Sequence, residues 1–226
     1  MRRPSRWPLH QDSGPHLVAT ATEAPMQRYS RGPEPVLRCC LLSGGASRRM
    51  GQDKAMLTHP EGGTWLERSL RLLAELQTPI TLLSRWPEHL ALADTLGLPH
   101  LELVAEPAPW EGPLLALHRL MERYPGERLL TAPVDMPDLN LAALKTLLSA
   151  ASAAPQTIQI AQGGDQLQPL LAVFPANAAL RRDLSHAVAL GERRLQSWLH
   201  QQRWQAVALD PQAMRNCNRP EEIQRP

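Results

Sequence analysis

From residue 36 onward, short apolar runs alternate with amphipathic segments, and this alternation restricts the possible folds more than any other feature. The apolar runs predict strands at 36–42, 80–83, 101–104, 128–132, 158–161, 169–174 and 206–209. The segments between them predict helices after Thr64 and at 87–96, 114–121, 141–150, 176–188 and 193–202, with a short helix after Pro220. Strands that alternate with helices are typical of βαβ units and a parallel sheet. We therefore expect an α/β fold, a single three-layer α/β/α Rossmann-like domain with a mostly parallel sheet.

The first 35 residues lack this pattern. They contain six prolines and no hydrophobic periodicity, which predicts a disordered tail at 1–35 before a folded domain at 36–226. Hydrophobic residues make up 43% of the 226-residue chain, as in ordinary globular proteins. No apolar stretch approaches the ~20 residues that a membrane helix needs, so we expect no membrane partner.

Charge and cysteine content indicate which partners and which cellular compartment to expect. The formal net charge is +2 and the charged residues are spread along the chain, which argues against a nucleic-acid partner. The three cysteines, Cys39, Cys40 and Cys217, fit neither a zinc-site spacing nor a disulfide framework. Thiols of this kind are typical of a reducing compartment, so we expect the cytoplasm.

The first predicted strand opens into a loop at 43–54 that contains three glycines, two arginines and a lysine. Glycines let the backbone approach a ligand closely, and successive backbone N–H groups in such turns bind anions. Arg48, Arg49 and Lys54 add positive charge at the same place. The spacing matches neither the Walker A loop nor the dinucleotide fingerprint. The loop therefore indicates a phosphate-binding site of another kind.

Three predicted loops should meet at one edge of the sheet, because ligands of open α/β sheets lie beyond the carboxyl ends of the strands. These loops are 43–54, 106–112 and 133–137. The last contains Asp135, which follows the fourth predicted strand. A carboxylate opposite a phosphate-binding loop suits Mg²⁺, which takes one or two carboxylates together with substrate phosphates. A capping or turn role is the alternative for Asp135, although Asp138 suits that role better.

The loop after the first strand also points to a family. The signature loop of the molybdenum cofactor nucleotidyltransferases, and most closely of the MobA family of guanylyltransferases, resembles the run Leu42-Ser43-Gly44-Gly45-x-Ser47-x-Arg49-Met50-Gly51-x-Asp53-Lys54-Ala55. Further family segments resemble residues 132–137, 168–173, 191–194 and 216–222, so that the resemblance covers 36–226. It implies a nucleotide-diphospho-sugar-transferase-like fold.

The resemblance also implies a reaction and its partners. GMP would pass from Mg-GTP to molybdopterin or molybdenum-bound molybdopterin, pyrophosphate would leave, and the guanine dinucleotide form of the cofactor would result. The implied partners are GTP, the pterin, and proteins that deliver molybdopterin or mature molybdoenzymes. Mg²⁺ is the implied cofactor.

The family's functional residues carry over position by position. The resemblance implies nucleotide contacts at Leu42, Ser43, Gly44, Gly45, Lys54, Ser84, Glu106 and Asp135. It implies catalytic roles for Lys54 and Arg49, which would hold phosphates, and for Asp135, which would hold the metal. Implied pterin contacts are Arg193, Arg194 and Asn218, with a solvated helix start as the alternative for the two arginines. Ser43 stands where alanine is commonest, and Glu106 where aspartate is usual.

Several alternatives remain open from the sequence. A sister enzyme could use CTP, or a nucleotidyltransferase could act on another phosphorylated acceptor. Cytosine-transferring relatives usually have Ala-Gly at Gly44-Gly45 and lack the Asp-Lys pair, so both features favour GTP. A non-catalytic relative that binds nucleotide or pterin is a third possibility. Asp53 either orients Lys54 or caps a helix, and Trp110 either stacks on a purine or pterin ring or packs at the sheet edge.

Overall fold

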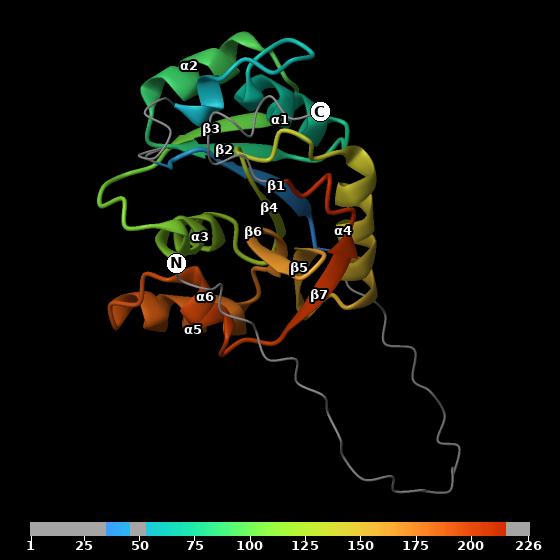
Figure 1. Cartoon of the computed structure of the whole chain (residues 1–226). Helices are drawn as coiled ribbons and strands as arrows, with labels where there is room; N and C mark the ends of the chain where they lie inside the picture. The colour runs from blue at the N-terminus through green and yellow to red at the C-terminus, as the bar shows by residue number, and fades with distance from the viewer. Residues whose placement is uncertain (1–34, 46–52, 216–226) are drawn as a thin grey trace, which may run out of the picture. The chain divides into compact units, whose positions relative to one another are not determined.

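The computed structural model describes residues 35–45 and 53–215 (Figure 1). The predicted tail at 1–35, except Pro35, lies outside these ranges, as do Arg49, Asn218 and the predicted helix after Pro220. The described residues form, in chain order, β1 (Leu37–Leu42), η1 (Lys54–Met56), α1 (Trp65–Ala74), β2 (Ile80–Ser84), α2 (Pro87–Thr95), β3 (Leu101–Ala105), α3 (Pro113–Arg123), β4 (Arg128–Pro133), α4 (Leu141–Ala153), β5 (Ile158–Gly163), β6 (Gln166–Pro175), α5 (Ala178–Ala189), α6 (Leu195–Leu199) and β7 (Trp204–Leu209).

One seven-stranded sheet organises the domain, in the order β3-β2-β1-β4-β6-β5-β7. All neighbouring pairs are parallel except those of β6, which runs antiparallel to both β4 and β5. The predicted, mostly parallel sheet is therefore confirmed. Because β1, β2, β3 and β4 are parallel neighbours, the loops that follow them emerge at one edge of the sheet.

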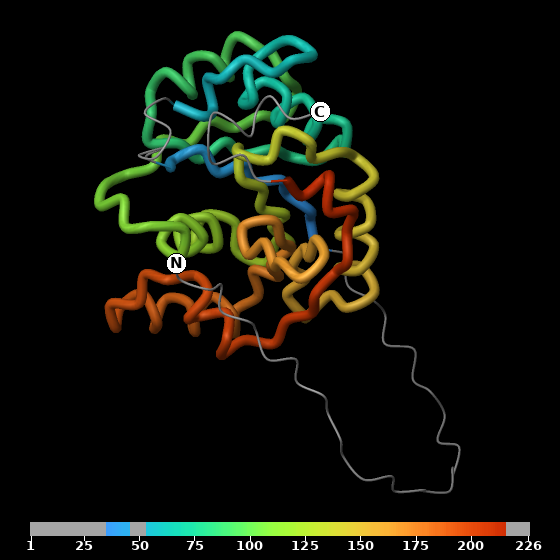
Figure 2. Tube along the Cα trace, viewed as in Figure 1, coloured from blue at the N-terminus to red at the C-terminus, as the bar shows by residue number. Residues whose placement is uncertain are grey.

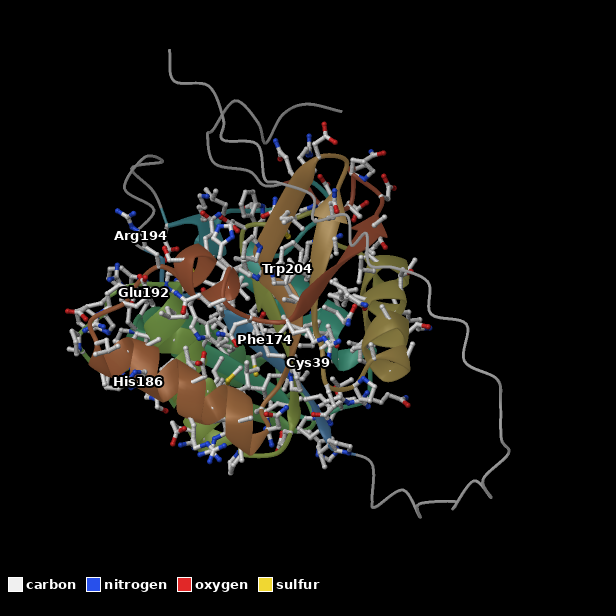
Figure 3. All side chains as sticks on the ribbon, turned by 90° about the horizontal axis from the view of Figure 1, so that it is seen from below. Cys39, Phe174, His186, Glu192, Arg194 and Trp204 are labelled. Atoms are coloured by element: carbon white, nitrogen blue, oxygen red, sulfur yellow. The ribbon has the colours of Figure 1, made fainter. Side chains whose placement is uncertain are left out.

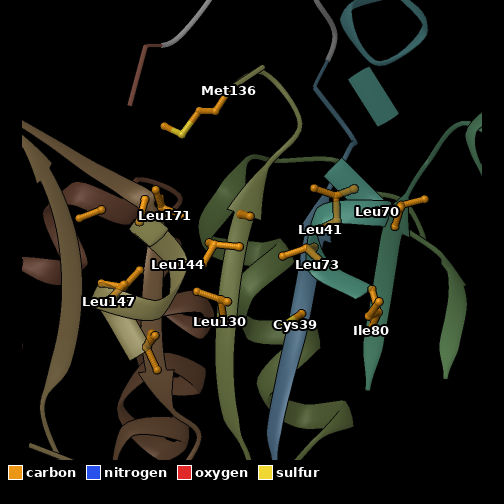
Figure 4. Close-up of a cluster of buried hydrophobic side chains, with 14 of the residues drawn as sticks. Cys39, Leu41, Leu70, Leu73, Ile80, Leu130, Met136, Leu144, Leu147 and Leu171 are labelled. Atoms are coloured by element: carbon orange, nitrogen blue, oxygen red, sulfur yellow. The ribbon is translucent and has the colours of Figure 1, made fainter. Parts of the chain in front are cut away.

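Helices cover both faces of this sheet, which gives the predicted three layers (Figures 1 and 2). On one face, α1 and α4 pack over Cys39, Leu41 and Leu130, and Figure 4 shows this cluster. On the other face, α3, α5 and α6 pack over a second cluster that contains Cys40 and Leu129. Successive residues of a strand alternate between faces, so β1 and β4 supply both cores. Central strands covered on both faces explain why these segments are continuously apolar in sequence.

The ends of several elements follow from local hydrogen bonds. The helix predicted after Thr64 has a complete capping box, in which the Thr64 hydroxyl accepts from the backbone N–H of Glu67 at 3.2 Å. The helix predicted at 193–202 is shorter than expected, since α6 begins only at Leu195. The Glu192 carboxylate accepts from the N–H groups of Arg193 and Arg194, both at 2.7 Å, and holds these residues in the preceding loop. Among the described residues, none of the helices is long and apolar enough to cross a membrane.

Candidate active site

A cavity of about 360 Å³ opens where β1, β2, β3 and β4 end. Its size suits part of a small-molecule ligand. It brings together the three loops predicted to meet at this edge. The predicted site residues that line it are Leu42, Ser43, Gly44, Gly45, Lys54, Glu106 and Asp135.

Lys54 and Asp135 form an ion pair in the cavity, with 3.0 Å between Nζ and Oδ2. The loop after β4 supplies Asp135, and the short η1 turn supplies Lys54. Asp53 caps that turn, because its Oδ1 accepts from the N–H of Ala55 at 3.1 Å. The capping role considered for Asp53 is therefore present, and it fixes the position from which Lys54 reaches across the cavity.

The single carboxylate of Asp135 fits a Mg²⁺ ion whose other ligands come mainly from the substrate. Among residues 35–45 and 53–215, no group of three or more His, Cys, Asp or Glu side chains could hold a metal. One carboxylate facing a cavity that also holds a lysine is compatible with Mg²⁺ bound through one protein ligand, phosphate oxygens and water. A zinc site built wholly from protein ligands would need more side chains.

A buried histidine that sequence reasoning missed supports the end of β1. His89, on α2, is 1% exposed. Its Nδ1 lies 2.9 Å from the Ser43 hydroxyl and 3.0 Å from the Ser84 hydroxyl, and its Nε2 contacts an Asp53 carboxylate oxygen. The imidazole therefore joins the end of β1 to the residue that caps η1. The Ser43 hydroxyl therefore has a hydrogen-bond partner that an alanine at this position could not use.

Ser84 lies under the cavity and is fully buried. Its hydroxyl donates to the backbone carbonyl of Ser43 at 3.0 Å and accepts from the N–H of Trp86 at 3.1 Å. The side chain supports the backbone that lines the cavity and is not itself part of the lining. The nucleotide contact at Ser84 stays a prediction.

Glu106 lines the cavity beside Gly44 and is held by Arg119 of α3, a partner that the sequence did not reveal. Arg119 Nη1 donates to Glu106 Oε1 at 2.8 Å. A Cβ added at Gly44 would lie 2.6 Å from Oε2, so a side chain at this position would require the Glu106 carboxylate to shift. Burial raises the pKa of the Glu106 carboxyl, and the opposing charges of Arg119 and Arg85 do not cancel that effect.

Trp110 and Arg85 complete this wall of the cavity. Trp110 is 52% exposed, and its indole N–H donates to the backbone carbonyl of Glu106 at 2.8 Å. The ring therefore lies next to the end of the edge strand β3 and also faces the cavity, and its stacking on a ligand stays a prediction. Arg85 directly follows β2, and its guanidinium carbon lies 5.3 Å from the centre of the Trp110 ring.

Neither Arg193 nor Arg194 is part of the cavity lining. Arg193 pairs with Glu111 and donates to the Val188 carbonyl at 3.0 Å. A Cβ at Gly112, which lines the cavity, would lie 3.5 Å from the Arg193 carbonyl, so the two loops are neighbours. Arg194 is exposed at the start of α6, near Glu192 (Figure 3). Their pterin role stays a prediction, and those of Arg49 and Asn218 fall outside the described residues.

Known proteins resemble this chain in sequence and in fold. A probable molybdenum cofactor guanylyltransferase of Rhodopirellula baltica is 33% identical over 199 residues, covering 84% of this chain and 91% of that protein. A molybdenum cofactor guanylyltransferase of a Shewanella species is 27% identical over 187 residues, covering 82% of this chain and 92% of that protein.

Two solved structures show the same fold at lower identity. Molybdopterin-guanine dinucleotide biosynthesis protein A of Archaeoglobus fulgidus has a TM-score of 0.63 and 18% identity, covering 83% of this chain and 95% of that one. A 4-diphosphocytidyl-2C-methyl-D-erythritol synthase of Anaerococcus prevotii has a TM-score of 0.65 and 11% identity, covering 84% and 96%. The profile of the MobA-like NTP transferase domain matches residues 39–207. The chain therefore belongs to the MobA-like NTP transferase family.

Proposed function

We propose that this protein is a molybdenum cofactor guanylyltransferase, which transfers GMP from GTP to molybdopterin or molybdenum-bound molybdopterin and releases pyrophosphate. The observation that carries the proposal is the Lys54–Asp135 pair, which faces the glycine-lined end of β1 across one cavity. The relatives named as guanylyltransferases match more than four fifths of the chain, which supports the choice of reaction.

The chain's own residues would act by positioning and by neutralising charge. The acceptor is a phosphate that is already anionic near neutral pH, so the site needs no strong general base. Gly44 and Gly45 would let the triphosphate approach the backbone, and Lys54 would place an ammonium beside its phosphates. Asp135 would hold Mg²⁺, which supplies further neutralisation of the triphosphate when bound. Arg49 would add a second phosphate contact, while Arg193, Arg194 and Asn218 would contact the pterin.

The proposed setting is the cytoplasm, where GTP and the pterin are available together with proteins that deliver molybdopterin or mature molybdoenzymes. The described cysteines, Cys39 and Cys40, are buried free thiols. Burial raises the pKa of Cys39 to about 11, so this thiol stays protonated and unreactive at neutral pH. Both cysteines therefore act as small core residues, as a reducing compartment permits.

Transfer of α-labelled nucleotide onto molybdopterin with Mg²⁺, measured for GTP and CTP side by side, tests the proposal. We expect label from GTP and little from CTP. Asp135→Ala should abolish transfer, whereas Asp94→Ala, which removes an exposed carboxylate on α2, should leave it unchanged. A preference for CTP would move the protein to the sister activity. No transfer from either nucleotide, with intact pterin, would indicate another acceptor or a non-catalytic binder.

A further inference from the structure

The guanidinium of Arg85 lies on the cavity wall with hydrogen-bond donors that the rest of the described chain leaves unused. Within residues 35–45 and 53–215, Arg85 makes no hydrogen bond and no ion pair, and its Nε is buried without an acceptor. A buried donor without a partner is costly, and arginine carries five donors in a planar fork. Its Nη N–H groups also make no hydrogen bond to the described residues, and they are the donors available to a molecule that enters the cavity.

Two indole rings hold the Arg85 side chain. Its guanidinium carbon lies 4.6 Å from the centre of the Trp86 ring and 5.3 Å from that of Trp110. Cations are attracted to indole faces at such distances. The Trp110 ring is fixed by its bond to the Glu106 carbonyl and remains half exposed. A planar fork of donors beside an open aromatic ring is typical of a site for a flat heteroaromatic ligand.

Arg85 lies at a different part of the sheet edge from Lys54 and Asp135, where the phosphates would bind. Asp135 follows β4 and Arg85 follows β2, and β1 lies between these two strands. With neighbouring strands about 4.8 Å apart, the two strand ends are separated by roughly 10 Å. In a nucleotide, the ribose places the base and the phosphates at opposite ends. If the phosphates lie at Lys54 and Asp135, the base lies toward Arg85.

We propose that Arg85 selects guanine, with its guanidinium donating to the O6 and N7 acceptors of the base while the Trp110 ring lies against it. This inference rests on the proposed use of GTP. Arginine suits that pair of acceptors because its fork matches their spacing. Adenine and cytosine instead present an amino donor at the corresponding edge, and arginine has no acceptor with which to receive it. Arg85 would thereby favour GTP over both ATP and CTP.

Nucleotide affinity, measured by titration calorimetry with GTP, 7-deaza-GTP and ATP, tests this role. In 7-deaza-GTP a C–H group replaces N7, so one of the two proposed hydrogen bonds is lost. We expect the unaltered protein to prefer GTP over 7-deaza-GTP by about tenfold, and Arg85→Met to reduce that preference to within about twofold. Arg182→Met, at an exposed site on α5, is the matched control and should keep the full preference.

The outcomes separate base selection from other roles. If Arg85→Met weakens all three nucleotides equally, the side chain contacts phosphate or ribose and the inference is wrong. An unaltered protein that does not bind GTP, or does not distinguish it from 7-deaza-GTP, would overturn it too. If Arg85→Met does not fold, Arg85→Lys keeps the cation without the fork and should still lose the preference. Because affinity is measured without pterin, failure of transfer would count against the proposed function alone.

Discussion

His89 contacts both described flanks of the predicted phosphate-binding loop. Ser43 precedes the undescribed segment and Asp53 follows it, and the buried imidazole contacts both. Removing the ring would leave the buried Ser43 hydroxyl without its imidazole partner and would release the Asp53 carboxylate, which caps η1. An unpaired buried polar group costs about 1–3 kcal/mol. Under the proposed function, His89 is therefore a positioning residue, which would act on the nucleotide through Lys54 and the end of β1.

We expect His89→Ala to raise KM for GTP by about fivefold or more, which corresponds to roughly 1 kcal/mol of lost ground-state binding. KM should change more than kcat, because the phosphates lose their positioning while Asp135 remains. Steady-state transfer kinetics with GTP varied would measure both constants. His118→Ala is the control, since it removes a half-buried histidine on α3 that bonds Ser185 at 3.1 Å. An equal loss of stability in both variants without a change in KM would show that His89 has a structural role only.

Sequence patterns identified some site residues and not others, for a physical reason. Asp135 could be predicted because it directly follows a strand signal, and Lys54 because it ends a glycine-rich loop that resembles a family signature; both line the cavity. His89, Arg119 and Arg85 could not, since their importance arises from contacts between separate loops and helices. The bond between Arg119 and Glu106 joins α3 to the end of β3, and only the folded topology shows that these positions meet.

Element boundaries were predictable where the hydrogen bond that sets them has a recognisable residue spacing. The capping box at Thr64 needs only the spacing from Thr64 to Glu67, so the start of α1 followed from the sequence. The start of α6 depends on the Glu192 side chain, which bonds the backbone ahead of the helix. An acidic residue next to two arginines gave no distinctive signal for this arrangement.

We expect Thr64→Ala to lower the free energy of unfolding by about 1 kcal/mol, because the N–H of Glu67 loses its acceptor. Urea unfolding followed by circular dichroism would measure it. Thr146→Ala is the matched control on the exposed face of α4, where alanine is the better helix former and stability should stay equal or rise. Equal destabilisation by both substitutions would contradict the capping role.

At the scale of the whole domain, a polar network ties three strands and a helix together. Tyr124, after α3, donates to Glu102 of β3 at 2.7 Å and accepts from Thr81 of β2 at 2.9 Å. The Arg38 guanidinium of β1 lies 3.9 Å from the centre of the Tyr124 ring. Burial alone would raise the pKa of Glu102, but bonds from Tyr124 and Arg123 outweigh it and lower that pKa.

A lowered pKa in the folded state means that ionised Glu102 stabilises the fold. This contribution is complete above the unfolded pKa and is lost as pH falls through the lower, folded pKa. We expect Glu102→Gln to be less stable than the unaltered protein at pH 7, with the difference shrinking below about pH 4. Urea unfolding at several pH values would measure it. Glu75→Gln, at the exposed end of α1, should show no such trend, and a constant difference for Glu102→Gln would contradict the prediction.

The reversed direction of β6 has a consequence for how such a domain can diversify. Since β6 runs against its neighbours, it begins at the edge where the other strands end, and its Leu170 lines the cavity. The β5–β6 turn at Gly164 and Asp165 can gain or lose residues while the register of β1, β2, β3 and β4 stays fixed. Changes in this hairpin can thus alter the strand that supplies Leu170 to the cavity and leave the parallel strands unchanged.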